Sequence, residues 1–412
     1  MKIQNIRARE IFDSRGIPTI ECELSLEDGA VVTSSVPSGI SRGMHEAIEL
    51  RDGGERLMGL GVQTAVDIIN DVIAPLLIDT EPDFVVCDSE LLELDGTNNK
   101  SHLGANSILA TSIVVCKAQA YQEGLEIYEL IAHLSHEDTV ALPCPMFNFL
   151  GGGLHTDNSF KIQELLVVPK GASSFRDAME KGVIIFHVLK EILRVKGKNT
   201  AVGYEGEFVP LFKNDKEAFD ILMEAIEKSG CGQGIMISLD VAASHLYNNE
   251  TGLYRWNDKD ITSHDLVDWY KQLLATYPIY SIEDGLSEVD WNGWKLMKEA
   301  LGSRVRLVGD DLFATDPQRI WNGIEHNVAT TALIKPNQIG TLTETLQAVE
   351  LCRENGWDVI VSHRSGETND SFIADLAVGV SAGHIKAGGC SRGERMAKYN
   401  RLLAIEDELM GR

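Results

Sequence analysis

The chain has 412 residues and a formal net charge of -25, from 37 Lys and Arg against 62 Asp and Glu. Such a field repels polyanions, so the composition argues against nucleic acid and anionic membranes as partners. A chain of this length exceeds one ordinary hydrophobic core and predicts two domains, or one large barrel with an addition.

Two further features of the composition indicate a cytoplasmic protein. The longest apolar run stops at Lys117, well short of the roughly 18 residues of a membrane helix, and charges interrupt the N-terminal segment where a signal peptide needs an apolar core. The seven cysteines form neither close pairs nor metal-type spacings, which favours reduced, buried thiols.

The first predicted elements are strands. Residues 3–12, 19–26 and 30–36 are rich in β-formers, and the hairpin dipeptide Asp28-Gly29 separates the last two. The next segment, 37–43, holds two glycines and two serines, and is either an ordinary connector or a functional loop.

A helical pattern then runs from residue 46 to about 133. Residues 61–76 carry apolar side chains at helical spacing and end near Pro75, whereas 106–121 is apolar on most sides and predicts a buried helix. Strands followed by helices indicate a separate α+β domain. We place it at 1–135, with a polar linker around 134–141, and expect the second domain at 136–412.

The second domain begins with a glycine run. Residues 149–155 lack the Lys-Ser/Thr of a phosphate-binding loop, so the pattern favours a tight turn or a flexible lid over a nucleotide site. A predicted strand at 162–168 carries Gln163 and Glu164, and an amphipathic helix follows at 174–194. Residues 201–207 form an acidic loop with spaced glycines.

From Gly234 to Lys386, short β-branched runs repeatedly end on one charged or titratable residue and give way to a helical pattern. Later strand ends are roughly 25 residues apart, the length of one strand plus one helix, which predicts a (β/α) barrel with its chemistry at the strand ends. The residues at these ends are Asp240, Glu283, Asp310, Lys335, His363 and Lys386.

The three carboxylates at successive strand ends predict a metal site. Adjacent parallel strands lie about 4.8 Å apart, so Asp240, Glu283 and Asp310 can converge on one point. Oxygen ligands without Cys or His suit a hard cation such as Mg²⁺. For any one of these residues alone, a cap on the following helix is the alternative.

A base and an anion site are predicted beside the metal. Lys335 reaches the barrel mouth, where burial, Lys386 and the nearby divalent cation would lower its pKa and make it a general base. His363, Arg364 and Ser365 supply donors for an anionic group such as phosphate, unless they form only a helix N-terminal loop.

Together these groups describe proton abstraction beside a carboxylate, with a metal that neutralises the dianion. If a hydroxyl leaves from the next carbon, an acid is needed as well. Glu164 and Glu205 are the candidates for that acid.

Motifs along the whole chain carry a resemblance to a known family. They are Asp13-Ser-Arg-Gly16, Gln163-Glu164, Asp240-Val-Ala-Ala-Ser244, Ser281-Ile-Glu-Asp-Gly285, Gly309-Asp-Asp-Leu312, Lys335 with Asn337-Gln-Ile-Gly-Thr-Leu342, Ser362-His-Arg-Ser-Gly-Glu-Thr368 and Ile373-Ala-Asp-Leu376. In this combination the chain closely resembles the enolase family. The resemblance implies Mg²⁺-dependent dehydration of 2-phosphoglycerate to phosphoenolpyruvate in glycolysis. It also implies an N-terminal α+β domain capping a modified (β/α)8 TIM-type barrel, and a homodimer or higher oligomer.

The resemblance implies a role for each candidate residue. Lys335 matches the base, which also contacts substrate, and Glu205 matches the acid, with Glu164 beside it. The three carboxylates match the ligands of the first of two Mg²⁺ ions, and Ser41 of the lid matches the residue that reaches the second, held together with the substrate phosphate. The remaining substrate-binding candidates are His155, Gln163, His363, Arg364, Ser365 and Lys386.

The chain departs from the family pattern beside this site. The usual Gly-Asp-Glu-Gly-Gly reads Gly203-Tyr-Glu-Gly-Glu207, so an aspartate next to Glu205 is lost and Glu207 is gained. A negative neighbour helps to keep an acid protonated, a role that Glu207 could take over. The other departures are Arg42 in the lid, Leu150 for an asparagine before the glycine run, His245 for an acidic residue, and Pro336 after Lys335.

Two alternatives to enolase activity follow. One is a paralogue that dehydrates a related phosphorylated or phosphono hydroxy acid. The other is a structural or binding protein that kept the fold and lost the activity, although retention of Lys335, Glu205 and the three carboxylates argues against it.

Overall fold

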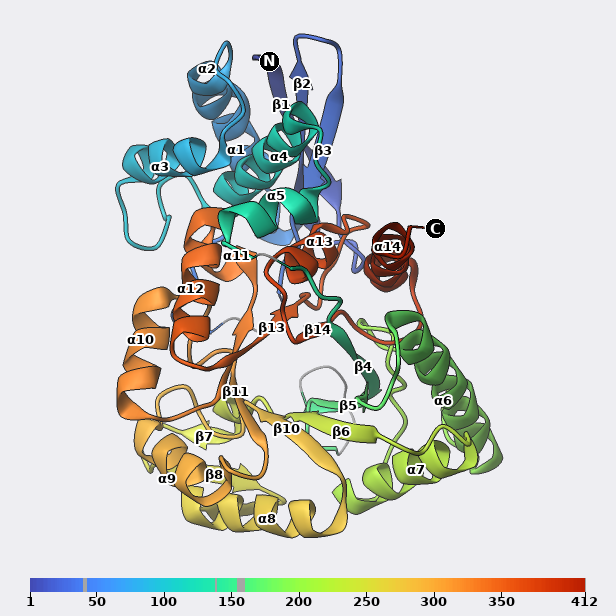
Figure 1. Cartoon of the computed structure of the whole chain (residues 1–412). Coiled ribbons are helices and arrows are strands. Elements are labelled where there is room, and N and C mark those ends of the chain that lie inside the picture. Colours follow the sequence, from blue (N-terminus) through green and yellow to red (C-terminus); the bar gives the residue numbers. More distant parts are fainter. Residues whose placement is uncertain (40–42, 138, 154–159, 412) are drawn as a thin grey trace.

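The structure is a computed structural model that describes residues 1–39, 43–137, 139–153 and 160–411. Figure 1 shows the N-terminal domain, in blue and teal, above a barrel formed by the rest of the chain. The predicted fold class, a modified (β/α)8 barrel with an N-terminal α+β domain, is confirmed.

The N-terminal domain contains one antiparallel sheet in the order β1-β2-β3, so the predicted meander is confirmed. Gly29 turns the chain between the last two strands, and its φ of 91° lies in the left-handed region that favours glycine. The strands are β1 (Ile3–Phe12), β2 (Pro18–Leu26) and β3 (Val31–Ser35).

The helices of this domain begin later than the pattern predicts. The helical prediction is wrong for residues 46–62, where the chain is irregular apart from the one-turn η1 (Arg56–Gly59). Pro75 lies in the first turn of α2 and the helical path continues to Leu77. The buried helix expected at 106–121 is confirmed as α4. The elements are α1 (Gln63–Ile68), the π-helical turn η2 (Ile69–Ile73), α2 (Ala74–Leu77), α3 (Phe84–Asp95), α4 (Ala105–Glu123) and α5 (Ile127–Leu134).

In the part of the chain that the structure describes, eight strands close a barrel in the order β10-β11-β12-β13-β14-β4-β5-β6. β5 runs antiparallel to both of its neighbours, β4 and β6, while the other pairs are parallel, and this is the modification of the barrel. The strands are β4 (Cys144–Gly151), β5 (Glu164–Pro169), β6 (Ile235–Asp240), β10 (Ile279–Glu283), β11 (Arg306–Gly309), β12 (Thr331–Ile334), β13 (Asp358–Ser362) and β14 (His384–Lys386).

Helices surround the barrel, and a small sheet of β7 (Tyr247–Asn248), β8 (Leu253–Trp256) and β9 (Lys259–Ile261) follows the short η4 (Ala243–Leu246). The helices are α6 (Phe175–Val195), α7 (Asp215–Lys228), α8 (Ser263–Thr276), α9 (Trp291–Leu301), α10 (Pro317–His326), α11 (Pro336–Ile339), α12 (Leu342–Glu354), α13 (Phe372–Gly379) and α14 (Gly393–Leu409).

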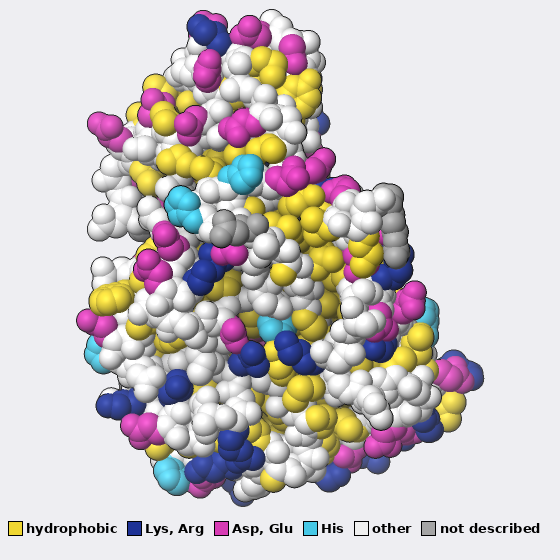
Figure 2. Space-filling view, in the orientation of Figure 1, with side chains coloured by type: hydrophobic (Ala, Val, Ile, Leu, Met, Phe, Trp, Pro, Cys, Tyr) yellow, Lys and Arg dark blue, Asp and Glu magenta, His cyan; other side chains and the backbone are white. Residues whose placement is uncertain are grey.

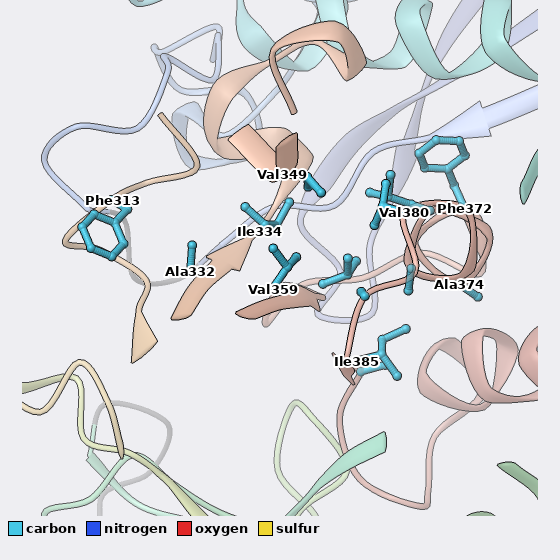
Figure 3. Close-up of a cluster of buried hydrophobic side chains, with 14 of the residues drawn as sticks. Phe313, Ala332, Ile334, Val349, Val359, Phe372, Ala374, Val380 and Ile385 are labelled. Carbon is cyan, nitrogen blue, oxygen red and sulfur yellow. The ribbon is translucent and has the colours of Figure 1, made fainter. Parts of the chain in front are cut away.

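Alternation along the strands separates an outer from an inner layer of side chains. Figure 3 shows Ile334 of β12 and Val359 of β13 among apolar side chains outside the barrel, near Val349 of α12. Leu333, which directly precedes Ile334 in β12, belongs instead to a cluster of side chains inside the barrel. Because Leu333 points inward and Ile334 outward, Lys335 is directed into the barrel.

The N-terminal domain rests on the loops that follow β12 and β13. Ser38 and Gly366 exchange two backbone hydrogen bonds of 3.0 Å, and the Ala47 N–H donates to the Gln338 carbonyl at 2.7 Å. This domain therefore covers part of the barrel rim at the carboxyl ends of the strands.

The surface carries charge of both signs. On the face in Figure 2, Lys and Arg side chains are interspersed with Asp and Glu over the barrel. Among the described helices, none is both long and apolar enough to cross a membrane.

Candidate active site

Five charged residues at the ends of barrel strands, which we call the carboxylate–lysine ring, meet inside the barrel. Neighbouring strands β6, β10 and β11 bring the three predicted metal carboxylates side by side, with Asp240 directly opposite Glu283. The ring consists of Asp240, Glu283, Asp310, Lys335 and Lys386, all of them buried except Lys335, which is nearly so.

Lys386 joins two carboxylates of this ring. Its Nζ donates to Asp240 Oδ2 at 2.9 Å and to the two Glu283 carboxylate oxygens at 2.9 and 3.0 Å. Burial alone would lower the pKa of Lys386, but the carboxylates of Asp240, Glu164 and Glu283 raise it well above its ordinary value. The residue predicted to contact substrate therefore also binds two of the predicted metal carboxylates.

Lys335 forms an ion pair with Asp310, with 2.5 Å between Nζ and Oδ2. The predicted lowering of its pKa is wrong for this arrangement. Burial does lower the pKa of Lys335, and Arg364 and Lys386 add to that effect, but the Asp310 carboxylate outweighs them and the pKa is raised. The pair must separate before Lys335 can accept a proton.

Asp284 holds the end of β11 in place. Its Oδ1 accepts the Asp310 N–H and its Oδ2 the Asp311 N–H, both at 2.9 Å. Oxygen atoms of Asp284, Asp310 and Asp311 lie within 4.8 Å of one another. Burial, followed by the charges of Asp311 and Asp310, raises the pKa of Asp284 well above its usual range. Since both of its oxygens bind backbone, Asp284 orients the Asp310 carboxylate.

The two candidate acids line the same cavity, and Glu164 lies directly opposite Asp240 in the strand pair β5–β6, 3.3 Å from Lys386 Nζ. Glu205 Oε2 accepts a hydrogen bond from Asn148 Nδ2 at 3.1 Å and lies 3.4 Å from His363 Nε2. Burial and then the charge of Glu205 raise the pKa of Glu164 well above its usual range. A raised pKa favours the protonated form that general acid chemistry requires.

The tautomer of His363 follows from its contacts. Arg395 Nη1 donates to His363 Nδ1, and because a guanidinium has only donors, the ring proton must lie on Nε2, which faces Glu205. Burial, despite the opposing effect of Glu205, lowers the pKa of His363 well below its ordinary value. The imidazole is therefore a neutral donor toward Glu205.

The predicted anion-binding residues connect the barrel with the N-terminal domain. Arg364 donates to both oxygens of Glu46, at 2.9 and 3.1 Å. Ser365 Oγ accepts from Arg15 Nη1 at 3.5 Å. The buried Gln163 Oε1 has no hydrogen-bond partner among the described residues and is therefore suited to a donor from a ligand.

One cavity brings these groups together. Its lining combines the two candidate acids, the base, the anion-binding residues and members of the carboxylate–lysine ring. The lining residues are Gln163, Glu164, Glu205, Asp240, Asp310, Lys335, Ser362, His363, Arg364, Ser365 and Lys386.

Several sequence-predicted residues lie elsewhere. Ser41, Arg42 and His155 fall outside the described residues. Of the described departures from the family pattern, Leu150 is buried in β4 opposite Leu165, and His245 is exposed.

Sequence reasoning missed the residues that orient the site. Asp284 carries a local signal, because it is a second carboxylate directly after Glu283. Glu46, Asn148 and Arg395 reach their partners across 318, 57 and 32 residues of chain, and no local pattern reveals such pairs.

Two of the three predicted metal carboxylates, Asp240 and Glu283, share one cationic partner, whereas the third, Asp310, pairs with Lys335 and lies within 4.8 Å of Asp284 and Asp311. Lys386 Nζ lies within 3.0 Å of both Asp240 and Glu283, so these two side chains already converge on one cationic position. The charges of Asp240 and Asp310 contribute to a raised pKa of Glu283, after burial. Buried like charges this close require a cation, and an all-oxygen donor set suits Mg²⁺.

The fold and the cavity define an enzyme of the (β/α)8-barrel class with its site at the carboxyl ends of the strands. Two family models match the chain: "Enolase, N-terminal domain" over residues 3–131 and "Enolase, C-terminal TIM barrel domain" over residues 139–412. The chain is 48% identical over 412 residues to the enolase of Natranaerobius thermophilus, covering 99% of this chain and 96% of that protein. The chain therefore belongs to the enolase family of hydro-lyases.

Proposed function

We propose that this chain catalyses the Mg²⁺-dependent dehydration of 2-phosphoglycerate to phosphoenolpyruvate in glycolysis. The observation that carries the proposal is the single cavity that Lys335, Glu205 and Arg364 line together. A base, an acid and an anion-binding guanidinium around one small space are what removal of water from a phosphorylated hydroxy acid requires. The relative named enolase supports the same activity.

The ring carboxylates Asp240, Glu283 and Asp310 would hold one Mg²⁺, and Ser41 would reach a second that binds with the substrate. Bound there, Mg²⁺ supplies positive charge that stabilises the substrate carboxylate as the neighbouring carbon loses its proton.

The protein's own residues carry the proton transfers. Lys335, in its neutral form, takes the proton from C2 of the substrate. Glu205, in its protonated form, gives its proton to the hydroxyl that leaves C3, which departs as water. The double bond of phosphoenolpyruvate forms between C2 and C3. Burial and then the charge of Glu205 raise the pKa of Glu164 well above its usual range, which favours the protonated form of this second carboxyl group.

The remaining residues position the substrate. Arg364 and Ser365 would bind the phosphate, with Arg364 exchanging Glu46 for the ligand. Gln163, His155, His363 and Lys386 would complete the polar contacts.

We further propose a cytoplasmic homodimer or higher homo-oligomer whose domains divide at 135/136. Light scattering on the purified protein measures the oligomer, and a purely monomeric particle would contradict this part of the proposal. Limited proteolysis tests the division, and cleavage confined to sites well outside 134–141 would contradict it.

The direct test is turnover of 2-phosphoglycerate by the purified protein with Mg²⁺, followed by the absorbance of phosphoenolpyruvate. We expect turnover that stops when a chelator removes Mg²⁺ and returns when it is restored. Absence of turnover with Mg²⁺ present would contradict the proposal. Dehydration of a related phosphorylated or phosphono hydroxy acid instead would identify the paralogue.

A further inference from the structure

Glu207 is a buried carboxyl group, two residues after the proposed acid Glu205, that the reaction outlined above does not use. Its exposed fraction is 0%, whereas Tyr204, at the other end of the same turn, is 44% exposed. A fully buried glutamate is rare because burial opposes its charge, so its position calls for a specific role.

The turn formed by residues 203–207, which we call the Glu205 turn, closes around the Glu207 side chain. Glu207 Oε2 accepts the backbone N–H of Glu205 at 2.8 Å, and the Gly203 N–H donates to the Glu207 carbonyl at 2.8 Å. Glu207 therefore binds the backbone of the proposed acid directly.

Two glycines leave the space that this side chain occupies. A Cβ atom on Gly151 would lie 2.7 Å from Glu207 Cγ, and one on Gly203 would overlap Glu207 Oε1. Both the end of β4 and the start of the Glu205 turn are thus shaped around Glu207.

Contacts on the other side orient the Glu205 turn. The Glu205 carbonyl accepts the Gly389 N–H at 2.8 Å, and the Tyr204 carbonyl accepts from Arg395 Nη2 at 2.9 Å. With Glu207 behind the turn, the Glu205 carboxylate is directed at Asn148 and His363.

We propose that Glu207 is a positioning residue for Glu205, holding the backbone of the Glu205 turn so that the acid lies against the leaving group of the substrate. The inference rests on the proposed function, because it assumes that Glu205 donates the proton to the leaving hydroxyl. Glu207 acts through Glu205 and does not touch the substrate.

The protonation state of Glu207 links this role to pH. Burial, and then the charge of Glu205, raises the pKa of Glu207 to about 8, against the lowering effect of Arg395 and of backbone N–H donors. His363, which contacts both Glu205 and Arg395, is neutral and adds no charge. Above about pH 8, Glu207 gains a buried negative charge next to the acid.

The deciding experiment separates the two proton transfers in Glu207→Ala. If Lys335 takes the C2 proton as proposed, 2-phosphoglycerate in D₂O should exchange its C2 hydrogen for deuterium without loss of the hydroxyl, a step in which Glu205 has no part. We expect dehydration kcat to fall about 100-fold, the scale of general acid catalysis, while C2 exchange stays within about 3-fold and KM within about 3-fold. Equal loss of both activities, or no loss of dehydration, would overturn the inference.

Glu207→Gln keeps the acceptor oxygen for the Glu205 N–H and removes the ionisation. Its kcat at pH 7 should stay within about 5-fold of the parent, and its activity should extend to higher pH because no charge forms at position 207. An unchanged basic limb of the pH profile would overturn the inference even if Glu207→Ala fails to fold.

Glu406→Gln is the matched control. Glu406 is also a buried glutamate that accepts backbone N–H bonds, from Phe175 and Arg176, but it lies away from the cavity. Its pH profile and exchange ratio should equal those of the parent. Failure of the proposed function itself is distinguishable, since the parent would then show neither dehydration nor C2 exchange.

Discussion

The carboxylate–lysine ring and the Glu205 turn face the same cavity but are positioned in different ways. The ring residues end barrel strands or directly follow them, so the strand ladder and the inner–outer alternation set the direction of each side chain. The Glu205 turn is held instead by individual hydrogen bonds: Glu207 accepts one from it, and Gly389 and Arg395 each donate one to it. The departures of Tyr204 and Glu207 from the family pattern fall in this turn, outside the barrel strands.

The comparison predicts the largest loss of activity within the ring. Lys335→Ala removes the proposed base, so we expect C2 exchange and dehydration to fall together by about 10³- to 10⁴-fold, while Mg²⁺ binding by calorimetry remains. The exposed Lys170, at the opposite end of β5 from Glu164, provides the control Lys170→Ala, which should retain parental activity. Persisting exchange in Lys335→Ala would show that another residue takes the proton.

A smaller loss of activity is expected at Asp284, which binds the backbone of the ring residue Asp310. Asp284→Asn replaces one of the two oxygens that hold the Asp310 and Asp311 N–H groups. Loss of a residue that orients a metal ligand weakens metal binding about 10- to 100-fold, so the Mg²⁺ concentration for half-maximal activity should rise by that factor. The control is Asp260→Asn, because Asp260 lies in β9 of the small sheet and pairs with Arg255. An unchanged Mg²⁺ requirement would separate Asp284 from the metal site.

The pH dependence of the unfolding free energy should reveal the titration of the buried Glu207. The pKa of Glu207 is about 8 in the folded protein against an ordinary 4.5, so the folded state binds the proton more tightly between these values. The unfolding free energy of the parent therefore falls as pH rises through this window, by at most about 1.4 kcal/mol per pH unit from this group. Denaturant unfolding of Glu207→Gln from pH 5 to 8 should show a shallower decline, and parallel curves would exclude the assignment.

The smallest effect belongs to Tyr204. Its side chain is exposed and its carbonyl, which any residue provides, accepts the Arg395 bond. Tyr204→Phe should change kcat/KM for 2-phosphoglycerate by less than about 2-fold, as expected for a surface substitution within roughly 0.5 kcal/mol. A larger change in steady-state kinetics would show that Tyr204, too, takes part in substrate selection.

Much of the barrel could be predicted because strand periodicity is a local property. The ends of β6, β10, β11, β12, β13 and β14 were predicted from short apolar runs followed by one titratable residue, and the structure places strands there. The helical prediction for 46–62 fails because partners far along the chain bind the backbone of that segment: Ala47 donates to the Gln338 carbonyl, Ile48 to the Asn99 carbonyl and Leu50 to the Asn106 side chain.

The sequence by itself determined which residues end the barrel strands and therefore which groups share the inner wall, since a period of two residues assigns each side chain to one face. Only the tertiary structure decided how those groups act on one another. The Asp310 contact reverses the predicted pKa shift of Lys335, Asp284 orients Asp310, and the glycines at 151 and 203 allow Glu207 to lie beneath Glu205. The physical reason is that Coulomb interactions and burial depend on distances in space, and residues far apart in the chain set those distances.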